Sequence, residues 1–300
     1  MPYKLTDPWN RAVRKYLGET KASICDDAYR NYKYMLAEAG EIIGYPDPSK
    51  ITLQQLKELE SKFAGKSDAT ISIKCHVTKT FLTDLGNAEA RRWKITHVPR
   101  PKVNGVFLTE EQIAVCRQAA RQLGPLQELT FSLGVDNGLR CIDQQRLTMQ
   151  NVEELLSLSR TSMILGKGRN GGKPGALVLS KMTVEPLRKF LEIRARTVEK
   201  WHLEASQKLF IVEYRDGHGA ALLSRVAMRQ LNKEVSELAK INFNTHDRRR
   251  SDGKRLRVIA KLPIETVAKC LRHESINQAF RAYIGIESDE LTEAQDRLNP

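Results

Sequence analysis

Cysteine is scarce in this 300-residue sequence, and long apolar runs are missing. The five cysteines lie far apart and form no CxxC pair. This excludes a disulfide framework and a cysteine-based zinc site, and it predicts reduced thiols in the cytoplasm. No apolar run approaches the ~20 residues of a membrane span, and the first residues lack the apolar segment of a signal peptide. We therefore expect neither a membrane protein nor a secreted one.

Glycine and proline are also sparse, with 18 and 11 residues respectively. Together with a 28% share of charged residues, this excludes a collagen-like chain and a disordered one. The hydrophobic share of 41% is enough for a buried core, and the length favours two ordinary domains over one large domain.

Positive charge is what the sequence has in excess, with a formal net charge of +13. Residues 1–97 hold 16 Lys/Arg and 12 Asp/Glu, residues 98–283 hold 32 and 19, and residues 284–300 hold one and five. The densest part is 248–261, where seven of fourteen positions are basic and Asp252 is the only acid. A solvated helix face is the ordinary explanation of a basic run. This density instead favours a polyanionic partner, above all nucleic acid.

A polar segment with two prolines and one glycine, residues 97–105, is the best candidate for a linker. Before it, helical periodicity over 9–17, 28–39, 52–65 and 68–85 predicts an all-helical domain of four or five helices. The boundaries that we expect are a helical domain over 1–97, a linker over 98–106, a second domain over 107–284 and an acidic tail over 285–300.

The second domain is predicted to be mainly helical with one small β-hairpin. Two short apolar runs, 161–165 and 176–179, flank a Gly/Lys-rich turn and give the only clear β signal. The predicted fold class is therefore mainly α with a small β-sheet, in two domains. Helices are expected at 109–123, 126–135, 140–147, 182–201, 224–240, 245–260, 263–271 and 275–283.

Two phosphate-binding motifs fail on their context. Residues 166–171 match GxGxxG, but a dinucleotide site needs a helix after that loop, and here a strand is expected. Lys173 is followed by Pro174, where a Walker A loop needs Ser or Thr to hold magnesium. There is no HExxH, no GxSxG and no carboxylate cluster with metal-site spacing, so we expect no metal and no cofactor.

Six polar residues of the basic region form a chemically coherent set. Two arginines can each grip a phosphate with two hydrogen bonds, and two histidines can exchange protons near neutral pH. A lysine at a hairpin tip can reach a leaving oxygen, and a tyrosine among cations can become a nucleophile. Such a set suits metal-free phosphoryl transfer at a DNA phosphodiester. The residues are Arg140, Lys167, His246, Arg249, His273 and Tyr283, with Lys173 as a competing hairpin lysine.

The order and spacing of these residues resemble the tyrosine recombinases, the phage-integrase family. DNGLRCID (136–143) is similar to the TGLRxxE/D box of that family, and LGKG (165–168) to its β-hairpin lysine. THDRR (245–249) is similar to its HxxR box, and LRHESIN (271–277) followed by Tyr283 to its LGHxSI…Y ending. Each box alone is weak, but four boxes in order are a strong signal. The resemblance extends over the whole chain.

The resemblance implies a role for each residue. Tyr283 attacks the scissile phosphate and forms a 3′-phosphotyrosyl link without metal or ATP. Arg140 and Arg249 bind the non-bridging oxygens, and Asp143 supports Arg140 from behind. Lys167 protonates the departing 5′-oxygen. The two histidines are His246, which assists proton transfer at the tyrosine, and His273, which hydrogen-bonds to the phosphate.

The resemblance also implies a DNA clamp, with a core-binding domain before the linker and a catalytic domain after it. We expect double-stranded DNA with a specific recombination site as the partner, and a homo-tetramer on two such sites. An accessory DNA-bending or directionality protein and a cytoplasmic, nucleoid-associated location are further expectations, with no membrane. Additional DNA contacts are expected from Arg169, Lys173, Arg248, Arg250 and Lys254.

Some alternatives stay open at this point. The chain is compatible with a type IB topoisomerase-like relaxing enzyme, and with a recombinase-derived DNA-binding protein without catalysis. Arg248, Arg250 and Arg272 replace the usual apolar residue, histidine and glycine of the family boxes, and the spacing to Tyr283 is one residue longer than is typical. Whether Tyr283 serves its own site or a neighbour's is undecided. The acidic tail is either a docking segment or a solvated helix end.

Overall fold

The computed structural model describes residues 7–97, 106–166, 172–214, 216–273 and 276. The chain divides into two compact units, Met1–Pro101 and Lys102–Pro300, and each is described by itself. The division falls within the segment that the sequence indicates as a linker. The acidic tail, and the last predicted helix apart from Ile276, lie outside the described residues.

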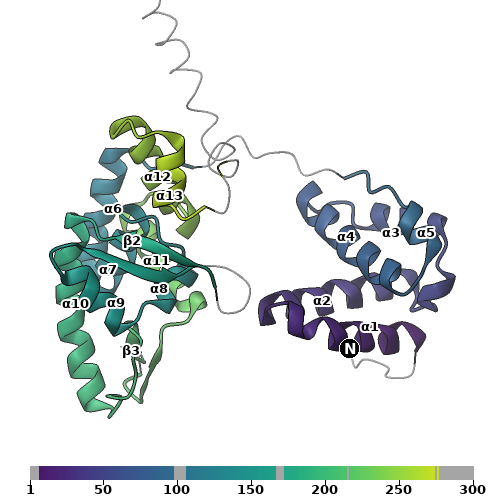
Figure 1. The fold of residues 1–300 in the computed structure, drawn as a ribbon, viewed down its shortest axis with the longest axis horizontal. Coiled ribbons are helices and arrows are strands. Elements are labelled where there is room, and N and C mark those ends of the chain that lie inside the picture. The colour runs from purple at the N-terminus through teal and green to yellow at the C-terminus, as the bar shows by residue number, and fades with distance from the viewer. Residues whose placement is uncertain (1–6, 98–105, 167–171, 215, 274–275, 277–300) are drawn as a thin grey trace, which may run out of the picture. The chain divides into compact units, whose positions relative to one another are not determined.

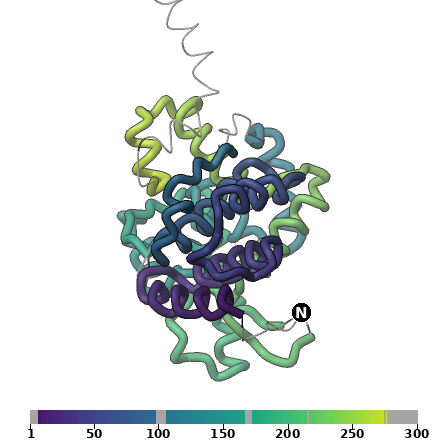
Figure 2. Tube along the Cα trace, turned by 90° about the vertical axis from the view of Figure 1, so that its right-hand side faces the viewer, coloured from purple at the N-terminus to yellow at the C-terminus, as the bar shows by residue number. Residues whose placement is uncertain are grey.

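The first unit is a bundle of helices, drawn in purple and blue (Figures 1 and 2). Most of these helices begin at a polar residue whose side chain accepts a hydrogen bond from the first turn, for example Asp7, Ser67 and Asn87. Such caps explain why the helices begin where they do. The helices are α1 (Pro8–Thr20), α2 (Asp26–Ile43), α3 (Leu53–Lys62), α4 (Asp68–Asp84) and α5 (Ala88–Arg92), with short 3₁₀ turns at Lys21–Ser23 and Pro48–Lys50.

Trp9 on α1 organises the core of the first unit. It is completely buried, its Nε1 donates to Leu36 O (2.9 Å), and its ring meets that of Phe81 edge-on with centroids 5.1 Å apart. Gly40 on α2 leaves room for the indole, since a Cβ there would lie 2.4 Å from Trp9 Nε1. The two helices therefore approach more closely than a larger side chain would permit.

Glu60 on α3 ties down the chain where it leaves the first unit. It is 5% exposed, and its carboxylate accepts hydrogen bonds from Thr96 N and Oγ1 (both 2.7 Å), His97 N (3.1 Å) and Trp93 Nε1 (3.2 Å). Burial raises the pKa of Glu60, but these hydrogen bonds together outweigh burial and hold the pKa below its ordinary value. The carboxylate thus fixes residues 93–97 against α3.

Glu60→Ala is expected to lower the free energy of unfolding by about 2–4 kcal/mol, because several donors lose their shared acceptor in a buried place. Glu60→Gln keeps the shape of the side chain and should lower the free energy of unfolding by less. The difference in stability between Glu60→Gln and the natural chain should shrink as the pH falls below 4.5, since stabilisation by an acid with a lowered pKa disappears on protonation. Urea unfolding followed by tryptophan fluorescence measures both. The exposed Glu58 on the same helix provides the control, and Glu58→Ala should change stability by less than about 0.5 kcal/mol.

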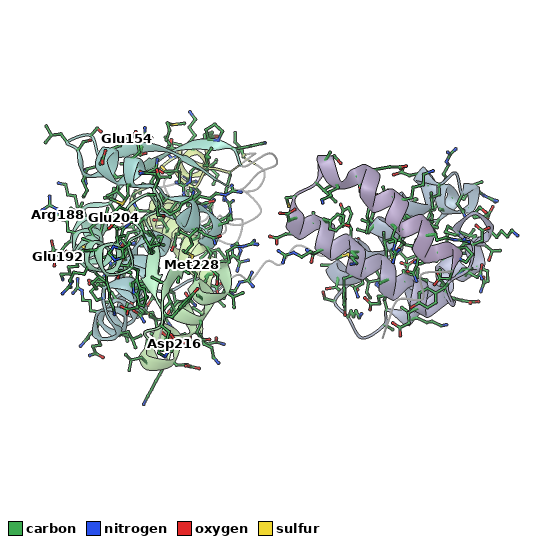
Figure 3. The ribbon with its side chains drawn as sticks, turned by 90° about the horizontal axis from the view of Figure 1, so that it is seen from below. Glu154, Arg188, Glu192, Glu204, Asp216 and Met228 are labelled. Carbon is green, nitrogen blue, oxygen red and sulfur yellow. The ribbon has the colours of Figure 1, made fainter. Side chains whose placement is uncertain are left out.

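The second unit is built around α7 (Pro125–Val135). Residues Glu128 to Val135 are all buried, because α7 packs against α6, α10, α11 and α12. Figure 1 shows α10 along one side of the unit and α12 and α13 together at one end. Arg188 and Glu192 on α10 lie at the outer edge of the unit (Figure 3). The other helices are α6 (Glu110–Leu123), α8 (Cys141–Arg146), α9 (Met149–Leu156), α10 (Lys181–Lys200), α11 (Arg225–Ala239), α12 (Thr245–Lys254) and α13 (Ile264–Cys270).

Two antiparallel hairpins complete the second unit. In the first, β1 (Thr161–Leu165) pairs with β2 (Pro174–Val178), and Ile164 and Leu177 are buried in the core. In the second, β3 (Ile211–Glu213) pairs with β4 (Ala220–Leu222). The predicted fold class, mainly α with a small β content, is confirmed.

Several elements differ from the sequence analysis. The helix α9 and the hairpin β3–β4 were not expected, and strands of three residues are too short for alternation to be recognised. The helix predicted over 245–260 is regular only to Lys254 and continues as a π-helical turn, Arg255–Ile259. The first residue of that turn is held by Glu110 (2.9 Å) and Asp136 (3.2 Å). A local pattern does not contain such contacts.

Candidate active site

The start of α12 is fixed by a reciprocal cap. The Asn244 side chain accepts hydrogen bonds from the backbone N–H groups of His246 (2.8 Å) and Asp247 (3.2 Å). The buried Asp247 carboxylate in turn accepts one from Asn244 N (2.8 Å). These bonds satisfy helix-start donors that would otherwise lack acceptors. They also set the positions of His246 and Arg249, which lie one turn apart.

Arg249 bridges two distant turns of the chain. It is 4% exposed, its Nη1 donates to Gly138 O, and its Nη2 donates to Leu271 O. The first carbonyl belongs to the turn between α7 and α8, and the second follows the end of α13. Three segments that are far apart in the sequence therefore meet at this side chain.

Arg140 lies at the N-cap position of α8, directly above a buried carboxylate. Its backbone N–H donates to Asp143 Oδ2 (3.1 Å), and its Nη1 lies 3.8 Å from the same oxygen. Asp143 has no exposed side-chain surface, whereas the Arg140 side chain is 20% exposed. Asp143 is thus placed to orient the guanidinium while leaving one side of it open to a ligand.

The base of the β1–β2 turn is held against α8. Arg146 Nη1 donates to Gly166 O, and Gly166 N donates to Lys173 O (2.8 Å). Gly172 has a φ of +116°, and a Cβ there would lie 2.2 Å from Arg146 Nη1, so only glycine fits. Three residues of the predicted site lie outside the described residues: Lys167, Arg169 and Tyr283.

His273 lies among three arginines, two residues after Leu271. Burial, and then the positive charges of Arg249, Arg140 and Arg272, lower the pKa of His273 to about 4. The imidazole is therefore neutral at pH 7. Its Nδ1 is buried and has no hydrogen-bond partner within the described part of the chain. A neutral imidazole carries one N–H group, which can donate a hydrogen bond to a bound phosphate.

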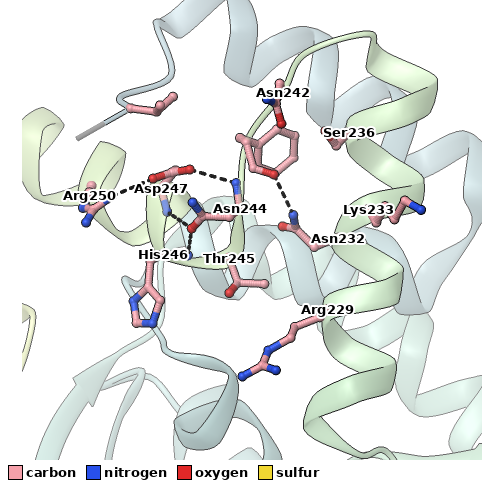
Figure 4. Close-up of a pocket in the computed structure, with 12 residues that line it drawn as sticks. Arg229, Asn232, Lys233, Ser236, Asn242, Asn244, Thr245, His246, Asp247 and Arg250 are labelled. Atoms are coloured by element: carbon pink, nitrogen blue, oxygen red, sulfur yellow. Dashed lines mark hydrogen bonds and ion pairs between the residues drawn. The ribbon is translucent and has the colours of Figure 1, made fainter. Parts of the chain in front are cut away.

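The structure therefore brings Arg140, Arg249 and His273 together, with Asp143 beneath Arg140. His246 is exposed and lines a cavity of about 710 Å³ between α11 and the start of α12 (Figure 4). In Figure 4 the side chains of His246 and Arg229 point to the same side of this cavity. The basic residues that line the cavity are Arg229, Lys233 and Arg250.

Arg248 requires a correction. It was predicted to contact DNA, but it is 2% exposed and donates from Nη1 to Thr130 O (2.7 Å). Gly134 on α7 leaves space for it, since a Cβ there would lie 2.9 Å from Arg248 Nε. Burial lowers the pKa of Arg248 to about 10, so the arginine stays charged at pH 7. Because a helix turns ~100° per residue, α12 directs Arg248 into the interior and Arg249 into the site.

The other basic residues predicted near the site are accessible to solvent. Arg250 is half-buried and pairs with Asp247 (2.8 Å). Lys173 is exposed at the base of the hairpin turn, and Lys254 is exposed at the end of α12, with Nζ 5.2 Å from the Phe107 ring centroid. Their contacts with DNA stay predictions.

Other charged residues around the site were not predicted from the sequence. Arg229 and Lys233 are four apart on one face of α11, and this basic i, i+4 spacing could have indicated them. Asp252, the only acid of the basic run, is 6% exposed. Burial, together with the charge of Asp136, raises the pKa of Asp252 to about 7. No sequence pattern marks an acid that the fold will bury.

Among the described residues, no helix is both long and apolar enough to cross a bilayer. Within the same residues, no three His, Cys, Asp or Glu side chains are grouped so that they could hold a metal ion.

The order and arrangement of the helices and strands are those of the tyrosine recombinase and integrase fold. The Tn1549 transposon integrase in complex with a circular intermediate DNA superposes with a TM-score of 0.70 at 12% identity, covering 96% of this chain and 99% of that one. The XerH site-specific recombinase bound to a palindromic difH substrate, in a post-cleavage complex, gives a TM-score of 0.67 at 17% identity, covering 96% and 84%.

A lambda integrase dimer bound to a COC′ core site gives a TM-score of 0.64 at 13% identity, covering 91% of this chain and 76% of that one. No protein-family model matches the sequence, and no curated protein sequence matches it either. At these identities the likeness is one of fold, and it extends over both units of the chain.

Proposed function

We propose that this chain is a site-specific recombinase, which breaks and rejoins double-stranded DNA through a 3′-phosphotyrosyl intermediate at Tyr283. The observation that carries the proposal is the convergence of Arg140, Arg249 and His273 from three distant segments. Two guanidinium groups and a neutral imidazole form a site for a bound phosphodiester, where positive charge stabilises the charge that develops in the transition state.

Each residue has one part in the proposed reaction. Arg140 and Arg249 bind the non-bridging oxygens, Asp143 orients Arg140, and His273 hydrogen-bonds to the phosphate. The Tyr283 oxygen forms the new bond to phosphorus, the 5′-oxygen of the DNA leaves, and the backbone link is conserved as a phosphotyrosine. The other two participants are Lys167, which protonates the departing oxygen, and His246, which assists proton transfer at the tyrosine.

The cavity between α11 and α12 is the proposed path of the DNA backbone beside the site. Arg229 and Lys233 line it from α11 and His246 from the start of α12, and the side chains of Arg229 and Lys233 are exposed. DNA-bound structures with the same fold support DNA as the partner. Side chains of this kind position the backbone without reading the sequence.

Replacing Arg229 and Lys233 together by alanine is expected to weaken DNA binding equally on all sequences. The plot of log K against log salt has a negative slope, and each lost phosphate contact should reduce the magnitude of that slope by about 1. The double variant should therefore reduce it by about 2. Arg188→Ala with Arg196→Ala removes the same charge from exposed positions of α10 and is the control. An equal loss of slope in both double variants would exclude a specific role for the cavity.

Covalent trapping tests the proposal directly. The full chain is incubated in EDTA and without ATP with nicked duplexes of random sequence, from which the short cleaved strand diffuses away. The expected result is a protein–DNA adduct that survives denaturation. Sequencing the trapped DNA would then give the recombination site. Normal DNA affinity without any adduct would instead favour a DNA-binding protein without catalysis.

Assembly follows from the proposed chemistry. Exchange of strands between two duplexes needs four cleaving subunits, so a homo-tetramer on two DNA sites is proposed, in the cytoplasm and at the nucleoid. An accessory DNA-bending or directionality protein would set the direction of the reaction. Relaxation of supercoiled plasmid with no dependence on a second site would favour the topoisomerase-like alternative.

A further inference from the structure

Arg272 is an arginine in a backbone conformation that favours glycine. It follows α13 with a φ of +52°, in the left-handed region, where every side chain with a Cβ is strained. It is half-buried, and its Nε is fully buried without a partner among the described residues. Backbone strain and a buried cation are both unfavourable, so the contacts of this side chain must compensate for them.

The guanidinium of Arg272 is committed to backbone carbonyls. Nη2 donates to Asn137 O and Gly138 O (both 3.3 Å), and Nη1 donates to Cys270 O (3.0 Å). Gly138 O also accepts from Arg249. Two arginines therefore tie the same turn, the one that leads into Arg140, to the end of α13.

The aliphatic part of Arg272 also covers the hairpin. A Cβ on Gly175 of β2 would lie 3.1 Å from Arg272 Cγ and 3.2 Å from Cδ. The titratable groups that face the arginine come from α8, α12 and α13. Burial together with Arg140 lowers the pKa of Arg272, while Asp143, Asp252 and Cys270 oppose this. Arg272 thus lies where α8, α12, α13 and β2 meet.

We propose that Arg272 is a positioning residue of the candidate active site, which clamps the Asn137–Gly138 turn against the end of α13 and so fixes Arg140 relative to His273. The inference rests on the proposed function for its catalytic readout. The positive charge of Arg272 has a second effect, because it acts with the charges of Arg140 and Arg249 to hold the pKa of His273 low. Asp143 and Asp252 are the acids near Arg272, and they limit this effect.

Arg272→Gly is the main test, because glycine removes the clamp and relieves the backbone. At saturating protein, adduct formation on the trapped duplex should slow by about 10- to 100-fold, as small misplacements of reacting groups do, while DNA affinity changes less than about threefold. Arg160→Gly is the control, since it replaces another arginine whose φ is nearly the same, +48°. It should leave adduct formation unchanged. Equal rates for Arg272→Gly and the natural chain would overturn the inference.

The titration of His273 separates this inference from the proposed function. In the full chain with ¹³C-labelled histidine, Arg272→Gly should raise the pKa of His273, whereas Arg272→Lys keeps the charge and should leave it nearly unchanged. An unchanged pKa in Arg272→Gly would overturn the inference even if no variant cleaves DNA. If Arg272→Gly does not fold, Arg272→Lys is the test. Lysine keeps the charge but lacks the planar guanidinium that donates to three carbonyls, so cleavage by Arg272→Lys at the natural rate would overturn the inference.

Discussion

Tyr283→Phe is expected to lower the rate of covalent adduct formation by at least ~10³-fold, because phenylalanine has no oxygen to bond to phosphorus. DNA affinity should stay within about threefold of the natural chain, since binding depends on the arginines and lysines rather than on this hydroxyl. The measurement is the fraction of nicked duplex that becomes protein-linked over time, beside a binding isotherm at the same salt concentration.

The matched control is Tyr214→Phe. Beyond residue 101 the sequence contains only two tyrosines, Tyr214 and Tyr283, and Tyr214 is 53% exposed after β3. Its phenylalanine variant should form adducts at the natural rate. If Tyr283→Phe still formed adducts and Tyr214→Phe did not, the nucleophile would be Tyr214. Adducts in both single variants would exclude a unique tyrosine nucleophile in the second unit.

Arg249→Ala is expected to lower adduct formation by about 10³-fold, the scale seen when a charge-stabilising donor is removed from a transition state. It should also lower the free energy of unfolding by about 1–3 kcal/mol, because Leu271 O loses its donor inside the protein and Gly138 O keeps only the one from Arg272. Single-turnover cleavage and urea unfolding of the same sample measure the two losses separately.

Arg248 provides the comparison that separates stability from chemistry. It is as buried as Arg249, belongs to the same helix and also donates to a backbone carbonyl. Arg248→Met should destabilise the second unit measurably, yet leave adduct formation within about threefold at a temperature where both variants are folded. A loss of cleavage in Arg248→Met equal to that in Arg249→Ala would show that Arg249 acts through stability alone.

The sequence predicted the fold well where physical rules are local. Capping residues such as Thr109 marked a helix start to within a residue, and apolar runs around a glycine-rich turn marked β1 and β2. It did not indicate β3 and β4, because three-residue strands carry no periodicity. Nor did it indicate the π-helical turn after Lys254, whose first residue is held by acids from other parts of the chain.

In the candidate site, too, local sequence patterns predicted some features, and contacts between distant residues determine the others. Spacing along the sequence singled out Arg140, Arg249 and His273, which the fold brings together. It could not separate Arg248 from Arg249, since adjacent positions of one basic run look alike until the neighbouring helix is known. Both are buried, but Gly134 leaves space for Arg248 against α7, whereas Arg249 reaches the turns of Gly138 and Leu271. Likewise, the protonation states of His273 and Asp252 arise from burial and from distant charges, which no local pattern contains.

The two carbonyls that hold Arg249 have a consequence for the newly made chain. One lies 111 residues before the arginine and the other 22 residues after it. No fragment that lacks either segment can complete this arrangement, and contacts of such long separation form slowly because a long loop must close first. A nascent or partly unfolded chain therefore has basic residues but not the assembled Arg140, Arg249 and His273 of the candidate site. Under the proposed function, cleavage of DNA would begin only once the fold is complete.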